Sequence, residues 1–60
     1  MRYDVAKELH KEDEVIVKRT GEVVRVLQTL THIRKTLKMV CIETVSKTGV
    51  FHVYFHDEVK

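Results

Sequence analysis

Four histidines and one cysteine are the side chains in this sequence that most readily bind metals or act as nucleophiles. His52 and His56 are four residues apart, a spacing that on a helix places two imidazoles side by side, where they could share a metal ion. The residues around them alternate between apolar and polar types, which instead predicts a strand. On a strand the two histidines lie about 13 Å apart, too far for one ion. We therefore expect exposed polar histidines, no metal and no cofactor.

The sequence also lacks a signature of nucleophilic or acid–base catalysis. Cys41 lies between the apolar residues Val40 and Ile42, with no histidine nearby in the sequence to act as its base. This pattern is typical of a small core or interface residue. No pair of carboxylates has a spacing that suggests acid–base chemistry, and two glycines are too few for a phosphate-binding loop. We expect that the protein is not an enzyme.

Positive charge is concentrated in the middle of the chain. The net charge is only +2, yet residues 15–38 contain six of the 11 lysines and arginines and a single acid, Glu22. An anionic partner would be attracted to this segment, and an aromatic side chain beside it could stack on nucleic-acid bases. The residues that would form such a nucleic-acid-binding surface are Lys18, Arg19, Arg25, His32, Arg34, Lys35, Lys38 and Tyr54.

The length of 60 residues predicts one small domain, residues 1–60, with a core of aliphatic side chains. There is no tryptophan, and the single cysteine cannot form an internal disulfide. Association with another chain would add buried surface to so small a core. The free thiol, the acidic N-terminal region and the absence of a long apolar run predict a cytoplasmic protein that does not associate with membranes.

The two glycines mark the turns that organise the domain. They close the tripeptides Arg19-Thr20-Gly21 and Lys47-Thr48-Gly49, and runs rich in β-branched residues flank both, as is typical of hairpin turns. Residues 1–12 are expected to form a short helix or an ordered arm, with Asp4 capping the helix start. Residues 13–60 are expected to form a barrel whose first strand covers about 13–19.

Residues 23–38 have two interpretations. As a helix, they would place apolar residues at steps of three or four and give a β-α-β-β chain. As strands, they would form a second strand after Gly21 and a loop or hairpin tip at 30–35, followed by a long strand over 36–45. The many β-branched residues favour the strands, because these side chains lose rotamer freedom in a helix.

The last strand has the clearest alternation in the chain. Phe51, Val53 and Phe55 share one face, which we expect to be buried, and the other face carries His52, Tyr54 and His56. The expected core is Val15, Val17, Val24, Val26, Leu37, Val40, Ile42, Phe51, Val53 and Phe55.

From Glu14 onward, this series of strands and turns resembles the SH3-like small barrels, including the KOW and Tudor-type branches of bacterial and phage proteins. The resemblance rests on the acidic turn that leads into Val15-Ile16-Val17, the strand opened by Gly21, and the aromatic strand that runs into an acidic turn at 56–59. It implies a mainly β, partly open barrel of about five antiparallel strands.

These features together predict a non-catalytic binding module. An open barrel has edge strands, and the aromatic strand 51–55 or the run 23–27 could pair with a protein partner or with a second copy in a homodimer. The alternative is RNA or DNA binding through the basic central segment. The resemblance implies an accessory protein of a bacterium or phage.

Overall fold

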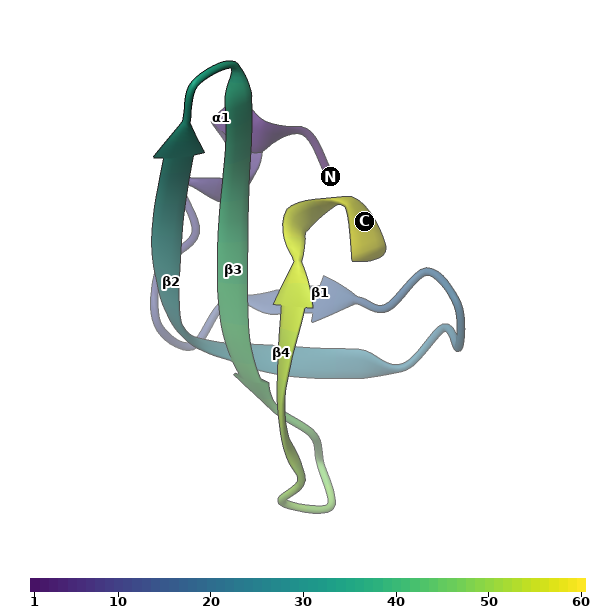
Figure 1. Cartoon of the computed structure of the whole chain (residues 1–60). Helices are drawn as coiled ribbons and strands as arrows, with labels where there is room; N and C mark the ends of the chain where they lie inside the picture. The colour runs from purple at the N-terminus through teal and green to yellow at the C-terminus, as the bar shows by residue number, and fades with distance from the viewer.

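A single curled sheet forms most of the molecule (Figure 1). The computed structural model describes all 60 residues, and its four strands are antiparallel and follow one another in sequence order. The sheet curls into a half-barrel with little helix, as the mainly β interpretation predicted. None of the helices is long and apolar enough to span a membrane. The elements are α1 (Tyr3–Ala6), β1 (Glu14–Ile16), β2 (Val23–Arg34), β3 (Leu37–Val45), β4 (Phe51–Phe55) and the 3-10 turn η1 (His56–Glu58).

The strand interpretation of residues 23–38 is confirmed, and the helical alternative is wrong. Residues 30–34 also continue β2, where a loop or hairpin tip was expected, so β2 and β3 form one long hairpin. The hairpin reverses at Lys35 and Thr36, where Lys35 has a φ of 55°. Glycine would adopt this φ more easily, and because the turn contains none, the sequence placed the expected loop or hairpin tip only broadly, at 30–35.

β2 contributes to both halves of the curled sheet. Its first residues pair with β1, and most of its length pairs with β3. The pairing with β3 shifts register between Val26 and Gln28, which marks a β-bulge. Bulges bend a strand and increase its twist, and in Figure 1 β2 turns from the direction of β1 to run beside β3. The bulge thus permits one strand to serve both ends of the half-barrel.

Both glycine turns are confirmed. Gly21 has a φ of 74° and Gly49 a φ of 87°, values that favour glycine. In the second turn, the Gly49 N–H donates to the Ser46 carbonyl at 3.0 Å, and the Ser46 N–H donates to the Val50 carbonyl at 2.9 Å. These bonds fix the start of β4 against the end of β3.

The C-terminal residues close the half-barrel against the end of β1. Val59 forms an isolated antiparallel bridge with Val17, and the Lys60 N–H donates to the Ile16 carbonyl at 2.9 Å. The Lys18 N–H donates to the Glu58 carbonyl at 3.0 Å on the other side of the bridge. The sheet therefore has four strands and one bridge, where about five strands were expected.

The core is small and mostly made of valine. Six of the expected core residues are buried, and Ala6 and Val59 join them in one cluster. Thr44 is the only buried polar residue, and its Oγ1 donates to the His52 carbonyl at 2.8 Å. The expected residues found in this cluster are Val15, Val17, Val24, Val26, Val40 and Ile42.

Four other residues expected in the core are exposed, and that part of the prediction is wrong. Leu37 is 59 % exposed, Phe51 72 %, Val53 56 % and Phe55 45 %. For the three residues on β4 the register with β3 is the reason, because Tyr54 lies opposite the buried Ile42. Leu37 is on β3, opposite Arg34, and lies on the outward-facing side with Met39 and Cys41. Alternation predicts two faces of a strand, but the register decides which one faces inward.

The N-terminal helix is a single short element, and its expected cap is absent. Arg2 occupies the N-cap position, and no side chain caps the helix. The Asp4 carboxylate instead accepts two hydrogen bonds from the Arg2 guanidinium, at 2.8 and 3.2 Å. These hydrogen bonds hold the pKa of Asp4 below its usual value. Ala6 is the residue through which α1 enters the core.

Candidate interaction surface

The outward-facing sides of β2, β3 and β4 form one continuous surface rich in exposed apolar side chains. Residues directly opposite in an antiparallel pair lie on the same face of the sheet. Cys41 faces outward with Leu30 on β2 and Phe55 on β4, because the register places it opposite both. We call this surface the outer apolar face and define it by Leu30, Leu37, Met39, Cys41, Phe51, Val53 and Phe55.

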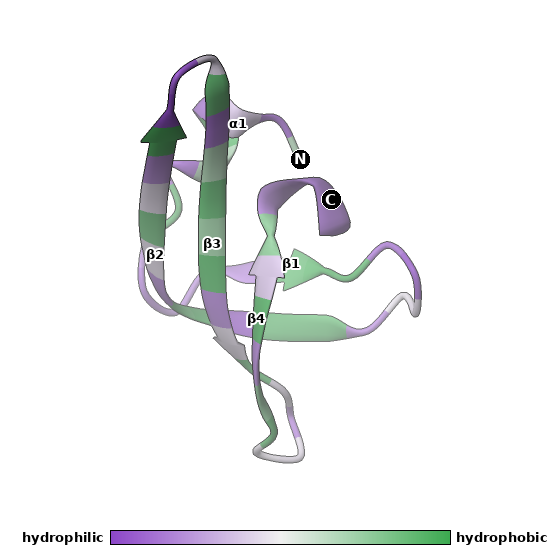
Figure 2. Cartoon of the chain, in the orientation of Figure 1, coloured by the Kyte–Doolittle hydropathy of each residue, from purple (hydrophilic) through white to green (hydrophobic).

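A hydrogen-bonded pair of polar side chains crosses the outer apolar face from β2 to β3, and His32 and Arg34 face outward opposite Met39 and Leu37. Gln28, Glu43 and Val53 lie side by side across the three strands, and the Gln28 amide donates to the Glu43 carboxylate at 2.9 Å. The two polar side chains therefore satisfy part of each other's hydrogen-bonding capacity within the chain. Figure 2 shows hydrophobic and hydrophilic segments alternating along β2 and β3.

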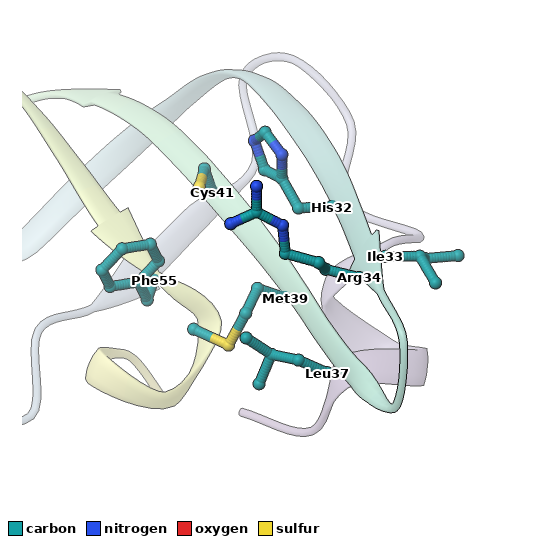
Figure 3. Close-up of a pocket in the computed structure, with 7 residues that line it drawn as sticks. All are labelled: His32, Ile33, Arg34, Leu37, Met39, Cys41 and Phe55. Carbon is teal, nitrogen blue, oxygen red and sulfur yellow. The ribbon is translucent and has the colours of Figure 1, made fainter.

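The outer part of the β2–β3 hairpin, residues 30–41, is called the β2–β3 arm below. A groove of about 570 Å³ hollows the outer apolar face between this arm and β4. Figure 3 shows the Met39 thioether extending toward Phe55, with Leu37 beside it. The Arg34 side chain reaches across β3 from the arm, and Ile33 points away from the other side chains. The groove is thus apolar at its base with positive charge on one rim. The full lining is His32, Ile33, Arg34, Leu37, Met39, Cys41 and Phe55.

The structure divides the eight residues predicted to bind nucleic acid among several places. His32 and Arg34 face outward from the β2–β3 arm, and Lys35 lies at its tip. Lys18 and Arg19 lie at the far end of β2, in the turn that follows β1. Only the arm therefore brings several of these cations together.

The remaining three predicted residues have partners of their own. Arg25 lies near Glu12, with its Nε 3.5 Å from the carboxylate. Lys38 is opposite Ile33 on the inner side of the arm, and its Nζ lies 6.0 Å from the centre of the Tyr3 ring. Tyr54 is half-buried and packs against the core. Lys38 and Tyr54 therefore do not share the outer face with Arg25, His32 and Arg34.

The histidines do not come together, and nowhere do three or more His, Cys, Asp or Glu side chains form a cluster that could hold a metal. His10, His32 and His52 are exposed, as expected. His56 differs from the expectation because it is half-buried and structural. Its Nδ1 accepts a hydrogen bond from the Val40 N–H at 3.2 Å, and its ring meets Tyr3 edge to face at 6.1 Å.

The outer apolar face itself was not predicted from the sequence as a surface. The alternating strand 51–55 indicated one apolar face, and that face was assigned to the core. The sequence did contain one indication of this surface, the charged residue Glu43 in the middle of β3. Its two neighbours Ile42 and Thr44 are buried, so Glu43 lies on the opposite, outward-facing side of the strand. A charged residue in register with Val53 indicates a face that meets solvent.

No protein-family model, curated protein or solved structure matches this chain.

Proposed function

We propose that the protein is a non-catalytic interaction module that binds a protein partner, or a second copy of itself, through the outer apolar face. The observation that carries the proposal is the exposure of Phe51, Val53 and Phe55 in a chain with only ten buried residues. Soluble monomers rarely leave contiguous apolar patches of several hundred Å² uncovered, and such patches commonly mark binding sites. Aromatic residues are also enriched where proteins meet.

An SH3-like barrel is part of the same proposal. The 3-10 turn η1 after β4 and the Val17–Val59 bridge support it, because together they bring the C-terminal residues against β1, where a fifth strand would lie. Such barrels carry many different functions. The choice of a binding role therefore rests on the outer apolar face, and a cytoplasmic location stays a prediction.

Nucleic-acid binding is the less favoured alternative. His32, Arg34 and Lys35 form a basic tip on the arm, but the other predicted cations lie at distant positions or beside carboxylate and aromatic groups. A phosphate backbone needs several cations on one surface. The outer apolar face instead presents mostly uncharged side chains.

Site-specific photo-crosslinking in the cells that make the protein tests the proposal. A benzophenone amino acid replaces Phe51, which is an exposed aromatic residue of the outer apolar face. The matched control carries it at Val5, an exposed apolar residue of α1 outside this face. We expect protein adducts from position 51 and none from position 5. Adducts that nuclease removes would favour nucleic acid, and an absence of protein adducts at position 51 would refute the proposal.

A further inference from the structure

β4 is the exposed edge strand of the sheet. It is the last strand in the order β1-β2-β3-β4, so only one of its edges is paired. Proteins commonly protect such edges with lysine, proline or a bulge. β4 contains neither lysine nor proline, and its register with β3 is continuous. Its free edge is therefore open to another strand.

The residues that expose apolar side chains on β4 also direct their backbone groups to this free edge. The Val50 and His52 carbonyls face β3, where they accept hydrogen bonds from the Ser46 N–H and the Thr44 hydroxyl. Alternate residues of an antiparallel strand bond to opposite sides. The N–H and C=O groups of Phe51 and Val53 consequently point away from β3.

We propose that a second copy of this chain adds its own β4 antiparallel to this edge, so that two half-barrels share one continuous sheet. The inference rests on the proposed function and names the partner. In a two-fold interface, residue i contacts j and residue j contacts i. A two-fold axis at Val53 pairs Phe51 with the partner's Phe55 and His52 with the partner's Tyr54. The sequence Phe-His-Val-Tyr-Phe therefore places an aromatic ring opposite an aromatic ring at all four of these positions.

The hydrogen-bonding pattern agrees with a two-fold axis at Val53. The outward-facing N–H and C=O of Val53 bond to the same groups of the second copy, and Phe51 bonds to the partner's Phe55 two residues away. The Phe55 N–H reaches only the Glu58 carboxylate, at a long 3.4 Å. Pairing with the second copy would replace this long bond with one to the partner strand.

The charges at the two ends of β4 favour the antiparallel arrangement. Lys47 lies in the turn before β4, and Asp57 and Glu58 follow directly after it. No acidic residue occurs from Ser46 to Phe55. Antiparallel pairing places the Lys47 turn of each copy beside the partner's Asp57, and the two-fold axis forms this contact twice.

The exposed area of the chain also leaves room for such an interface. A globular monomer of 7.1 kDa exposes about 4,100 Å² by the general relation between mass and surface, whereas this chain exposes 4466 Å². The chain is also elongated, with extents of 37 × 21 × 16 Å. Pairing along β4 would cover part of Phe51, Val53 and Phe55, the most exposed apolar strand.

Sedimentation equilibrium over a range of concentrations tests the arrangement through two charge reversals. We expect the full chain to form a dimer, and we expect Lys47→Glu or Asp57→Lys alone to weaken dimerisation on the order of tenfold, because each creates two repulsive contacts. The double variant Lys47→Glu with Asp57→Lys restores both contacts with reversed sign and should recover dimerisation. A double variant as weak as the singles would overturn the proposed pairing.

A backbone change tests the edge directly. A synthetic chain with N-methylated Val53 loses one outward donor, and we expect it to be a folded monomer by circular dichroism. The control is N-methylated Lys11, whose N–H makes no hydrogen bond in the structure and lies outside β4. If the methylated chain does not fold, the charge-reversal series decides.

The outcomes also separate this proposal from the proposed function. A monomer at every concentration would overturn pairing with a second copy. If position 51 still crosslinks to other proteins, the outer apolar face remains an interaction surface with a different partner. A dimer that persists after N-methylation of Val53 would place the contact elsewhere on the chain.

Discussion

The most informative stability experiment compares Phe51→Ala on the outer apolar face with Ile42→Ala in the core. Phe51 is 72 % exposed, so roughly a quarter of its side chain is covered, or about 50 Å² of the roughly 200 Å² that an aromatic side chain offers. At about 25 cal/mol per Å², truncation to alanine lowers the free energy of unfolding by at most about 1.2 kcal/mol. A core phenylalanine would instead lose about 3–5 kcal/mol.

Ile42 provides the opposite case, because its side chain is fully buried. We expect Ile42→Ala to lower the free energy of unfolding by about 2–5 kcal/mol. A domain of this length has a total stability of about 3–9 kcal/mol, so this variant could unfold. Ile42→Val, which should lose only about 0.5–1.5 kcal/mol, keeps the comparison within the folded range.

Urea denaturation followed by far-UV circular dichroism measures these differences. The experiment uses a low protein concentration, at which association does not add to the apparent stability. A loss of 3 kcal/mol or more for Phe51→Ala would refute the inward orientation of Tyr54 on β4 and the outer apolar face with it.

Three further predictions concern two turns and the half-buried His56. Gly49→Ala should lower the free energy of unfolding by about 1–2 kcal/mol, because alanine is strained at the positive φ of this position. A Cβ there meets no atom within 4 Å, so no steric clash adds to this cost. A loss under about 0.5 kcal/mol in urea denaturation would contradict this turn. Lys35→Gly should raise the thermal midpoint by a few degrees, because it relieves a φ of 55° at the arm's tip, and a lower midpoint would argue against that turn. His56→Ala should lower the free energy of unfolding by about 1–3 kcal/mol, because the buried Val40 N–H loses its acceptor. Faster hydrogen exchange at Val40 in that variant would identify the cause, and unchanged exchange would count against it.

The sequence by itself determined the two glycine turns and most of the strands. Gly21 and Gly49 are the positions where a positive φ was expected, and both have one. The first turn connects β1 to β2 and the second connects β3 to β4. The β-branched residues of 23–38 favoured strands because their side chains resist helical packing, and β2 and β3 confirm this. The six core residues were predictable because they recur at every second position of strand-like runs, a period that places them on one face: Val15 and Val17, Val24 and Val26, and Val40 and Ile42.

Other features required the tertiary structure because they depend on contacts between distant residues. The turn at Lys35 contains no glycine, and the pairing of β2 with β3 fixes it. The Val17–Val59 bridge joins the end of β1 to the C-terminal residues, a contact between positions far apart in the sequence that local propensity does not describe. His56 became structural through its bond to Val40 on another strand.

Which face of β4 points inward is the clearest example of a feature that depends on tertiary structure. Its alternation is unambiguous in the sequence, and the aromatic face is the more hydrophobic of the two. The register places Tyr54 opposite Ile42, and Val53 opposite Glu43, which occupies the outer side of β3. Because a shift by one residue exchanges the two faces of a strand, the pairing of β4 with β3 decided that the aromatic face meets solvent.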